Sequence, residues 1–408
     1  MNYTIKLNKL ELLLLVCIIS LMGYILYRFT YKKRHVWYHE GATDKTNEDK
    51  KDTEDETSST IEYPPRTVFN DITNLPLKEY AIYASFNSTY DGNANTLEQL
   101  GTIMYEGCRF IDLNVFQVNG EYYVGFAKDN APTLVEPSIT LSKVIEYINT
   151  YAFTIDSKIK DKVNASYNTM IANSMQTSSS EKETIQKNYI NYPLFVNVRV
   201  YRPPNSKTDI STGVLKVLTG KDGLRNLHVN SKRYAVPVNQ FTRLNELSKK
   251  VILTMDYQNI LQLYASVGSN IYDAKNIPVE TMKQINQSVN IQIGSDNWQA
   301  FYKYADVENN SYTMLTHKDT YLDINHSYET NTRVMKLAYP YFNEPANPDS
   351  YSYIQQHKIQ TIPHRFYIDD NNLTKYNKIF HDHKTPFVPL YNLHTYISKL
   401  TQEVKTTG

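Results

Sequence analysis

The side chains best suited to chemistry stand on two short apolar runs. The run Gly107-Cys108-Arg109-Phe110-Ile111-Asp112-Leu113-Asn114 carries a carboxylate and an amide, and residues 194–201 carry Arg199. Both runs predict strands, in which alternation could put Asp112 and Arg199 on inward-facing positions. A guanidinium can pair with a carboxylate, so these two side chains could form an ion pair if they face each other. The alternative is that Arg199 points elsewhere from a strand end.

Histidines offer a second kind of chemistry. His381-Asp382-His383 has residue types that bind metals, because two histidines two residues apart along a loop or strand can chelate a divalent ion. No acidic cluster obviously joins them, so a solvated triplet is the favoured interpretation. Other histidines are isolated, which is more typical of surface or packed residues. The sequence holds no Gly-rich phosphate loop, H-E-x-x-H or G-x-S-x-G motif.

The composition excludes some classes of protein. Lys and Arg total 43 against 42 Asp and Glu, so there is no net field to attract nucleic acid, and no nucleic-acid partner is expected. The bias toward tyrosine, with 35 Tyr and only 13 Gly in 408 residues, is typical of an AT-rich genome such as that of a large DNA virus. With two cysteines, Cys17 and Cys108, no disulfide framework can form, which fits a reducing compartment.

Periodicity in the globular part predicts an α/β fold. Eight strands are expected, at residues 80–87, 108–116, 121–127, 194–201, 250–256, 289–294, 333–339 and 360–368. Helices are expected between most of them, at 141–152, 210–218 and 278–285 among others. Strands that alternate with helices favour a parallel sheet, and eight such units predict a closed (β/α)₈ TIM-type barrel.

Three parts follow one another along the chain. Residues 1–34 hold an apolar run of about 20 residues at 12–31, long enough to span a bilayer as one transmembrane helix. Residues 35–62 predict a disordered acidic and polar tether, because so few apolar side chains cannot offset the entropy of ordering. Residues 63–408 carry the barrel, with an inserted polar segment near 155–190.

The run at 12–31 is interpreted as a retained anchor. A cleaved signal peptide would show a small-x-small site soon after the apolar residues, whereas residues 27–34 here read Tyr-Arg-Phe-Thr-Tyr-Lys-Lys-Arg. A buried helix is the other alternative. Lys6 and Lys9 precede the run, Arg28 lies near its end, and Lys32, Lys33 and Arg34 follow it. The larger number of basic residues at the C-terminal side predicts a single-pass protein with its globular part on the cytoplasmic side.

The order of short motifs resembles the phosphatidylinositol-specific phospholipase C family. That family has G-C-R, an apolar pair and Glu-x-Asp where this chain has residues 107–114, and S-S-H-N-T-Y near residues 84–90, which read Ala-Ser-Phe-Asn-Ser-Thr-Tyr. Y-A-F stands at 151–153, and weaker likenesses follow at 192–200, 247–253, 337–340 and 345–348. The resemblance covers roughly residues 75–389 and implies a phospholipase C-like phosphodiesterase barrel.

The resemblance also implies lost chemistry. The two catalytic histidines of the family fall at Phe86 and Gly125, and neither residue can transfer a proton. The calcium ligands Asn, Glu, Asp and Glu fall at Asn87, Asp112, Asn114 and Arg199, which changes their formal charge from −3 to 0. Calcium requires several anionic or carbonyl oxygens. The resemblance thus puts the Arg199 guanidinium in the place of the metal, where we expect it to pair with the Asp112 carboxylate. No catalytic residue, metal or cofactor is therefore expected.

Three functions stay open at this point. The leading interpretation is a membrane-anchored phospholipase C-like protein without phosphodiesterase activity, which binds a partner protein or a lipid headgroup. The first alternative is a divergent phosphoric diester hydrolase, acting on a phospholipid or glycerophosphodiester, with a rebuilt site. The second is a structural component of a membrane or virus particle.

The predicted anchor has a direct test. Because residues 12–31 would span the bilayer, the full chain expressed in cells should resist alkaline carbonate extraction, whereas residues 63–408 should be released as a soluble protein. Protease added to sealed vesicles with their cytoplasmic side outward should remove the globular part. A protected globular part would contradict the assigned topology.

Overall fold

The computed structural model describes residues 74–127, 134–163, 188–201, 210–224, 238–256, 259, 277–295, 298–301, 334–340 and 345–407. All of them belong to one compact unit, Thr67–Gly408. The predicted membrane span and tether lie outside these residues, as does 164–187 of the predicted polar insertion. Within the described ranges, the structure contains no helix long and apolar enough to cross a membrane.

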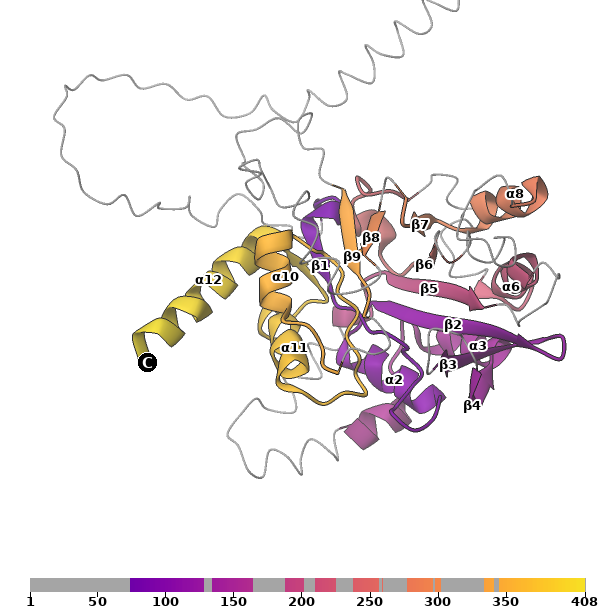
Figure 1. Cartoon of the computed structure of the whole chain (residues 1–408), viewed down its shortest axis with the longest axis horizontal. Helices are drawn as coiled ribbons and strands as arrows, with labels where there is room; N and C mark the ends of the chain where they lie inside the picture. The colour runs from indigo at the N-terminus through magenta and orange to yellow at the C-terminus, as the bar shows by residue number, and fades with distance from the viewer. Residues whose placement is uncertain are drawn as a thin grey trace, which may run out of the picture. The chain divides into compact units, whose positions relative to one another are not determined.

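The unit is built from alternating strands and helices (Figure 1). The strands are β1 (Tyr80–Ile82), β2 (Phe110–Val118), β3 (Glu121–Ala127), β4 (Leu134–Thr140), β5 (Leu194–Tyr201), β6 (Val251–Asp256), β7 (Ile291–Ile293), β8 (Trp298–Phe301), β9 (Met335–Ala338) and β10 (Phe387–Pro389). The α-helices are α2 (Leu97–Glu106), α3 (Leu141–Tyr151), α6 (Ile210–Thr219), α8 (Val279–Ser288), α10 (Ser350–His357), α11 (Asn371–His383) and α12 (Leu390–Thr407). Short 3₁₀ turns lie at Leu77–Glu79 and Leu244–Leu247.

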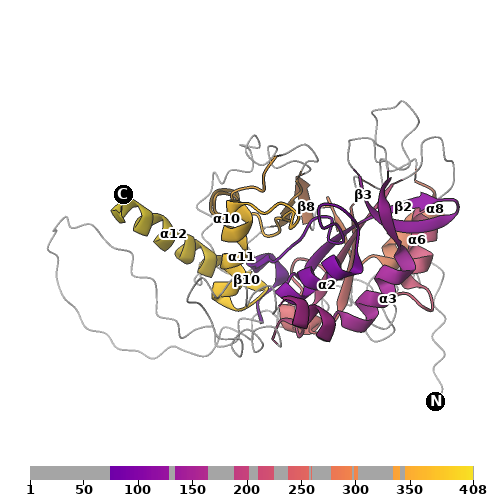
Figure 2. The ribbon, with the colours of Figure 1, turned by 90° about the horizontal axis from the view of Figure 1, so that it is seen from below.

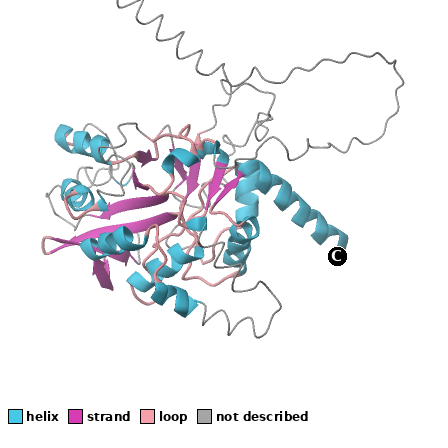
Figure 3. Ribbon diagram, turned by 180° about the vertical axis from the view of Figure 1, so that it is seen from behind, coloured by secondary structure: helices cyan, strands magenta, loops and turns pink. Residues whose placement is uncertain are grey.

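The largest sheet has the strand order β4-β3-β2-β5-β6-β7. Its neighbours β2, β5, β6 and β7 run parallel, and β3 and β4 extend it as antiparallel strands. Two further pairs are β1 with β10, antiparallel, and β8 with β9, parallel. Figure 3 shows these strands lying between the helices. The predicted α/β class is therefore confirmed.

The predicted closed barrel is only partly matched by this pairing. Isolated bridges join Ala84 to Phe110, Ile82 to Thr361 and Leu337 to Thr361, so that β1 and β9 are linked without a continuous ladder. The expected strand at 360–368 is reduced to bridges at Thr361 and His364. Pro363 between them has no backbone N–H to donate to a ladder. Residues 121–127 are a strand as predicted, but they form an antiparallel hairpin with β2.

Side chains alternate between two faces of the parallel strands. The face toward α3, α6 and α8 is apolar along its whole length, as at Ile111, Leu113, Val196, Val198, Leu253 and Met255. The opposite face begins with Phe110, Phe195 and Ile252 and then becomes polar. The register places Asp112 beside Asn197, Asn197 beside Thr254, and Asn114 beside Arg199. Polar side chains thus collect at the carboxyl ends of the parallel strands.

Two groups of helices flank the strands. Figure 2 shows α3, α6 and α8 gathered beside the six-stranded sheet, and α10, α11 and α12 gathered near the β1–β10 pair. The face of α3 predicted from its periodicity is buried, with Leu141, Val144, Ile145 and Ile148 in the core. The expected helices at 210–218 and 278–285 correspond to α6 and α8.

The Gly107-Cys108-Arg109 sequence has a structural explanation. Gly107 ends α2 with φ of 111°, in the left-handed region that favours glycine, and a Cβ there would clash with the ring of Tyr189. Cys108 is fully buried, and burial raises the pKa of its thiol. The buried Arg109 donates from Nε to the Tyr189 carbonyl at 2.9 Å and from Nη1 to the Ala152 carbonyl at 3.0 Å. These residues fix the entry into β2.

Alanine at Gly107 should destabilise the fold through both backbone strain and a clash. The matched control is Gly120→Ala, because Gly120 also has positive φ, 85°, but a Cβ added there would meet no atom within 4 Å. Left-handed backbone costs a non-glycine residue about 1–3 kcal/mol. Gly107→Ala should therefore lower the free energy of unfolding clearly more than Gly120→Ala in urea denaturation. Equal losses would contradict the close approach of Tyr189.

Candidate functional site

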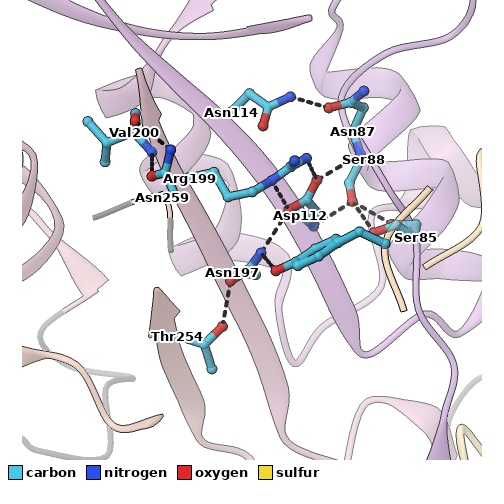
Figure 4. A network of polar contacts seen from close by, with 11 residues as sticks. Ser85, Asn87, Ser88, Asp112, Asn114, Asn197, Arg199, Val200, Thr254 and Asn259 are labelled. Carbon is cyan, nitrogen blue, oxygen red and sulfur yellow. Dashed lines mark hydrogen bonds and ion pairs between the residues drawn. The ribbon is translucent and has the colours of Figure 1, made fainter. Parts of the chain in front are cut away.

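The carboxylate of Asp112 is the centre of the polar cluster, and it is fully buried. Its Oδ1 accepts hydrogen bonds from Nδ2 of Asn197 at 2.8 Å and from Nε of Arg199 at 3.0 Å. Its Oδ2 accepts from Nη2 of Arg199 at 2.5 Å and from the backbone N–H of Asn87 at 3.2 Å. Figure 4 shows these donors converging on one carboxylate. A carboxylate has about four acceptor positions, and all of them are engaged.

Arg199 approaches from β5 and is only 8% exposed. Its guanidinium lies 4.5 Å from the ring centre of Phe86 and 5.1 Å from that of Tyr339, so two aromatic rings face the cation. Burial opposes the charged form, but the adjacent Asp112 carboxylate outweighs it, so the pKa of Arg199 is raised above its usual value. The predicted Asp112–Arg199 ion pair is confirmed, in the two-bond geometry that guanidinium favours.

Three further polar residues complete the cluster, and sequence reasoning missed them. Asn197 donates to the Tyr339 hydroxyl at 2.8 Å and accepts from the Thr254 hydroxyl at 3.1 Å. Asn197 and Thr254 each lie between apolar residues of a buried strand, and the strand register aligns them with Asp112. That placement was the available signal, since a polar residue in the middle of a buried strand needs a partner.

The loop after β1 brings Asn87 into the cluster. Its backbone has φ of 48°, which turns its N–H toward Asp112, and Ser88 Oγ accepts the backbone N–H of Asp112 at 2.9 Å. The Asn87 side-chain carbonyl accepts a hydrogen bond from Nδ2 of Asn114. The Oδ1 of Asn114 is buried and makes no hydrogen bond within the described residues. The four predicted site residues are thus brought together.

The two positions expected to hold catalytic histidines are filled differently. Phe86 is 1% exposed and lies against the guanidinium of Arg199. Gly125 lies where the register between β3 and β4 shifts, between Val124 and Phe126, a position at which glycine is common. Neither position presents a group that can transfer a proton.

Three half-buried aromatic side chains lie next to this cluster. Tyr90 stacks on Phe126 at 4.1 Å between ring centres, and Tyr367 meets both rings edge-on at 5.0 and 5.7 Å. Burial raises the pKa of the Tyr367 hydroxyl to about 12, against the opposing effects of Arg365, the Asn87 side chain and Arg199. The aromatic group is therefore close to the polar cluster and only partly exposed.

His364 and the two histidines of the His381-Asp382-His383 triplet make contacts other than with Asp112. His364 is fully buried, stacks on Tyr376 at 3.7 Å, and places its ring nitrogens 3.1 Å from the Ser350 hydroxyl and 2.8 Å from the Ile362 carbonyl. The His381-Asp382-His383 triplet lies on α11, where residues two apart point about 200° away from each other, so its histidines are not on one face. In the described ranges, no three His, Cys, Asp or Glu residues are grouped to hold a metal.

The cluster does not fit the calcium ion that the family resemblance implies. Both oxygens of Asp112 are bonded to Arg199 and other donors, and Asn87 Oδ1 is bonded to Asn114. Calcium takes 6–8 oxygen ligands, several of them anionic. The only side-chain oxygen among the four residues without a hydrogen bond is Oδ1 of Asn114, and Asn114 is paired in strand register with the cationic Arg199. We therefore assign no chemical step to a metal.

Known structures of phospholipases C are similar to this chain. PLC21 of L. pealei matches with 13% identity and a TM-score of 0.49, over 79% of this chain and 38% of its own length. The calcium-dependent phosphoinositol-specific phospholipase C of a Pseudomonas species matches with 13% identity and a TM-score of 0.34, over 76% of this chain and 98% of its own.

A calcium-dependent phosphatidylinositol-specific enzyme from Streptomyces antibioticus matches with 8% identity and a TM-score of 0.35, over 77% of this chain and 99% of its own. No protein-family model matches the sequence, and no curated protein matches it. At these identities and TM-scores the likenesses are too distant to transfer a residue role or an activity.

Buried His364 should make stability depend on pH. Burial lowers its folded-state pKa to about 4, whereas an exposed histidine has a pKa near 6.5. Between these values the unfolded chain binds the proton and the folded chain does not, so stability present above pH 6.5 should fall as the pH approaches 4. The expected decrease in the free energy of unfolding is roughly 3 kcal/mol.

Urea denaturation across this pH range measures the effect. His364→Gln should flatten the slope between pH 6.5 and 4, whereas His381→Gln, which changes an exposed residue of α11, should leave it unchanged. An unchanged slope in His364→Gln would show that His364 is not the group responsible.

Proposed function

We propose that this chain is a phospholipase C-like protein that has lost phosphodiesterase activity and binds a ligand or partner at the carboxyl ends of its parallel strands. The observation that carries the proposal is Phe86, which lies over the Arg199 guanidinium where the resemblance expects a catalytic histidine. The proposal includes a closed barrel, a membrane anchor at residues 12–31 and a cytoplasmic globular part.

Hydrolysis of a phosphodiester by this family's route needs a proton donor for the leaving oxygen. Phe86 and Gly125 supply none, and the one buried histidine of the described residues near β1, His364, has both ring nitrogens engaged. Asp112 is held by four donors, so its carboxylate has no free position for a substrate proton. These commitments favour binding over turnover and weigh against a rebuilt hydrolase.

The remaining polar and aromatic groups support a binding role. Arg199 stays charged at the strand ends while paired with Asp112, and Asn114 has an acceptor without a partner among the described residues. Tyr90, Phe126 and Tyr367 add half-buried rings beside them, which are common in recognition surfaces. A phosphate-bearing lipid headgroup suits this combination. A partner protein on the same surface is the other outcome of a binding test.

Purified full-length protein should not cleave phosphatidylinositol in mixed micelles, with or without calcium. General acid–base catalysis contributes about 10²–10⁴-fold, and both groups that supply it are absent. Phe86→His combined with Gly125→His should not recover activity, because Arg199 still occupies the cluster. Robust release of inositol phosphate by the unmodified chain would instead establish the hydrolase.

A binding measurement separates the remaining outcomes. Glycerophosphoinositol titrated into the same protein in calcium-free buffer should give saturable heat in calorimetry. The Arg199→Gln variant should bind this compound more weakly. Lys378→Gln, which removes an exposed charge on α11, is the matched control and should bind as the parent does. Absence of any heat would disprove headgroup binding and leave a protein partner or a structural role.

A further inference from the structure

The charges of the cluster are already balanced within the chain. Asp112 and Arg199 contribute −1 and +1, and the two asparagines contribute none. Both charged side chains come from neighbouring parallel strands, β2 and β5, and each is at least nine-tenths buried. A buried carboxylate requires a cation or several donors, because an unpaired buried charge is strongly unfavourable. In this protein the cation is a side chain.

We infer that Arg199 is a covalently attached cation that replaces a divalent metal in this cluster, so that the folded protein neither binds nor requires calcium. The guanidinium meets Asp112 through two bonds at 2.5 and 3.0 Å and is faced by two aromatic rings. Phe86 therefore has a role in the same arrangement, because its ring faces the cation.

The geometry favours a permanent Asp112–Arg199 ion pair over one that a metal ion displaces. Guanidinium keeps its charge at all ordinary pH values, and the contact with Asp112 raises the pKa further. Asn197 Nδ2 and the Asn87 N–H fill the remaining acceptor positions of the carboxylate. A metal could reach Asp112 only by displacing these donors. The inference concerns metal binding alone, so it can fail while the proposed binding function stands.

The first test compares the unmodified chain with a variant designed to rebuild the metal site. Full-length protein purified in detergent is melted in calcium or in chelator. The natural chain should show the same Tm in both. Arg199→Glu combined with Asn114→Asp adds two carboxylates beside Asp112 and Asn87, and its Tm should rise in calcium relative to chelator.

A matched control changes the same charges at exposed positions. Lys283→Glu combined with Asn93→Asp makes the same charge changes on the surface, and its Tm should not respond to calcium. A rise in the Tm of the natural chain with calcium would overturn the inference. The inference would also be overturned if the rebuilt variant folds but its Tm rises no more with calcium than that of the surface control.

A double-mutant cycle keeps the inference testable if the rebuilt variant does not fold. Arg199→Met and Asp112→Asn should each lower the urea midpoint, because each leaves a buried charge or its donors without a partner. The double variant should lose less than the sum of the two single losses, since the groups are in direct contact. Full additivity would mean that Arg199 does not compensate Asp112, and the inference would be wrong.

Discussion

The burial of one carboxylate determines how this end of the molecule is assembled. Asp112 has no exposed surface, and its two oxygens take donors from β5 and from the loop after β1. Removing such a charge from water is strongly unfavourable unless it is paired and hydrogen-bonded. The register between β2 and β5, the left-handed turn at Asn87 and the orientation of Arg199 are all needed to meet that requirement.

The same requirement accounts for the residues that surround Asp112. A guanidinium in the cluster neutralises Asp112, and Phe86 and Tyr339 place aromatic faces against it. A cationic histidine at position 86 would oppose that guanidinium by like-charge repulsion. An aromatic residue at position 86 and an internal cation at position 199 are therefore physically compatible, and together they form a cluster in which the buried charges are balanced.

The rest of the fold supplies rigidity to this cluster. The strands that carry Asp112, Arg199 and Thr254 have an apolar face packed on α3, α6 and α8 and an aromatic layer below the polar residues. The Arg109 contacts to two carbonyl groups fix the start of β2. A side chain held by strands packed on both faces has little freedom to rearrange, which is what a tight two-bond ion pair requires.

Local sequence patterns predicted several elements and one contact. Alternation and helical periodicity, which are properties of neighbouring residues, predicted the bounds of β3 and β5 and the buried face of α3. The Asp112–Arg199 pair was expected from the order of motifs, and the structure contains it. The strands β4, β8 and β10 were not predicted, and the expected strand at 360–368 became two bridges, because pairing depends on partners far away in the chain.

Sequence order alone determined that a carboxylate and a guanidinium stand on alternating positions of two apolar runs. Only the tertiary structure decided that Asn197, Thr254 and Tyr339 join them, since that depends on the register between strands and on a residue from β9's end. It also decided that His364 is committed to Ser350 and that Phe86 covers the cation. Residue types specify which interactions a side chain can make, and packing specifies which partner is within reach.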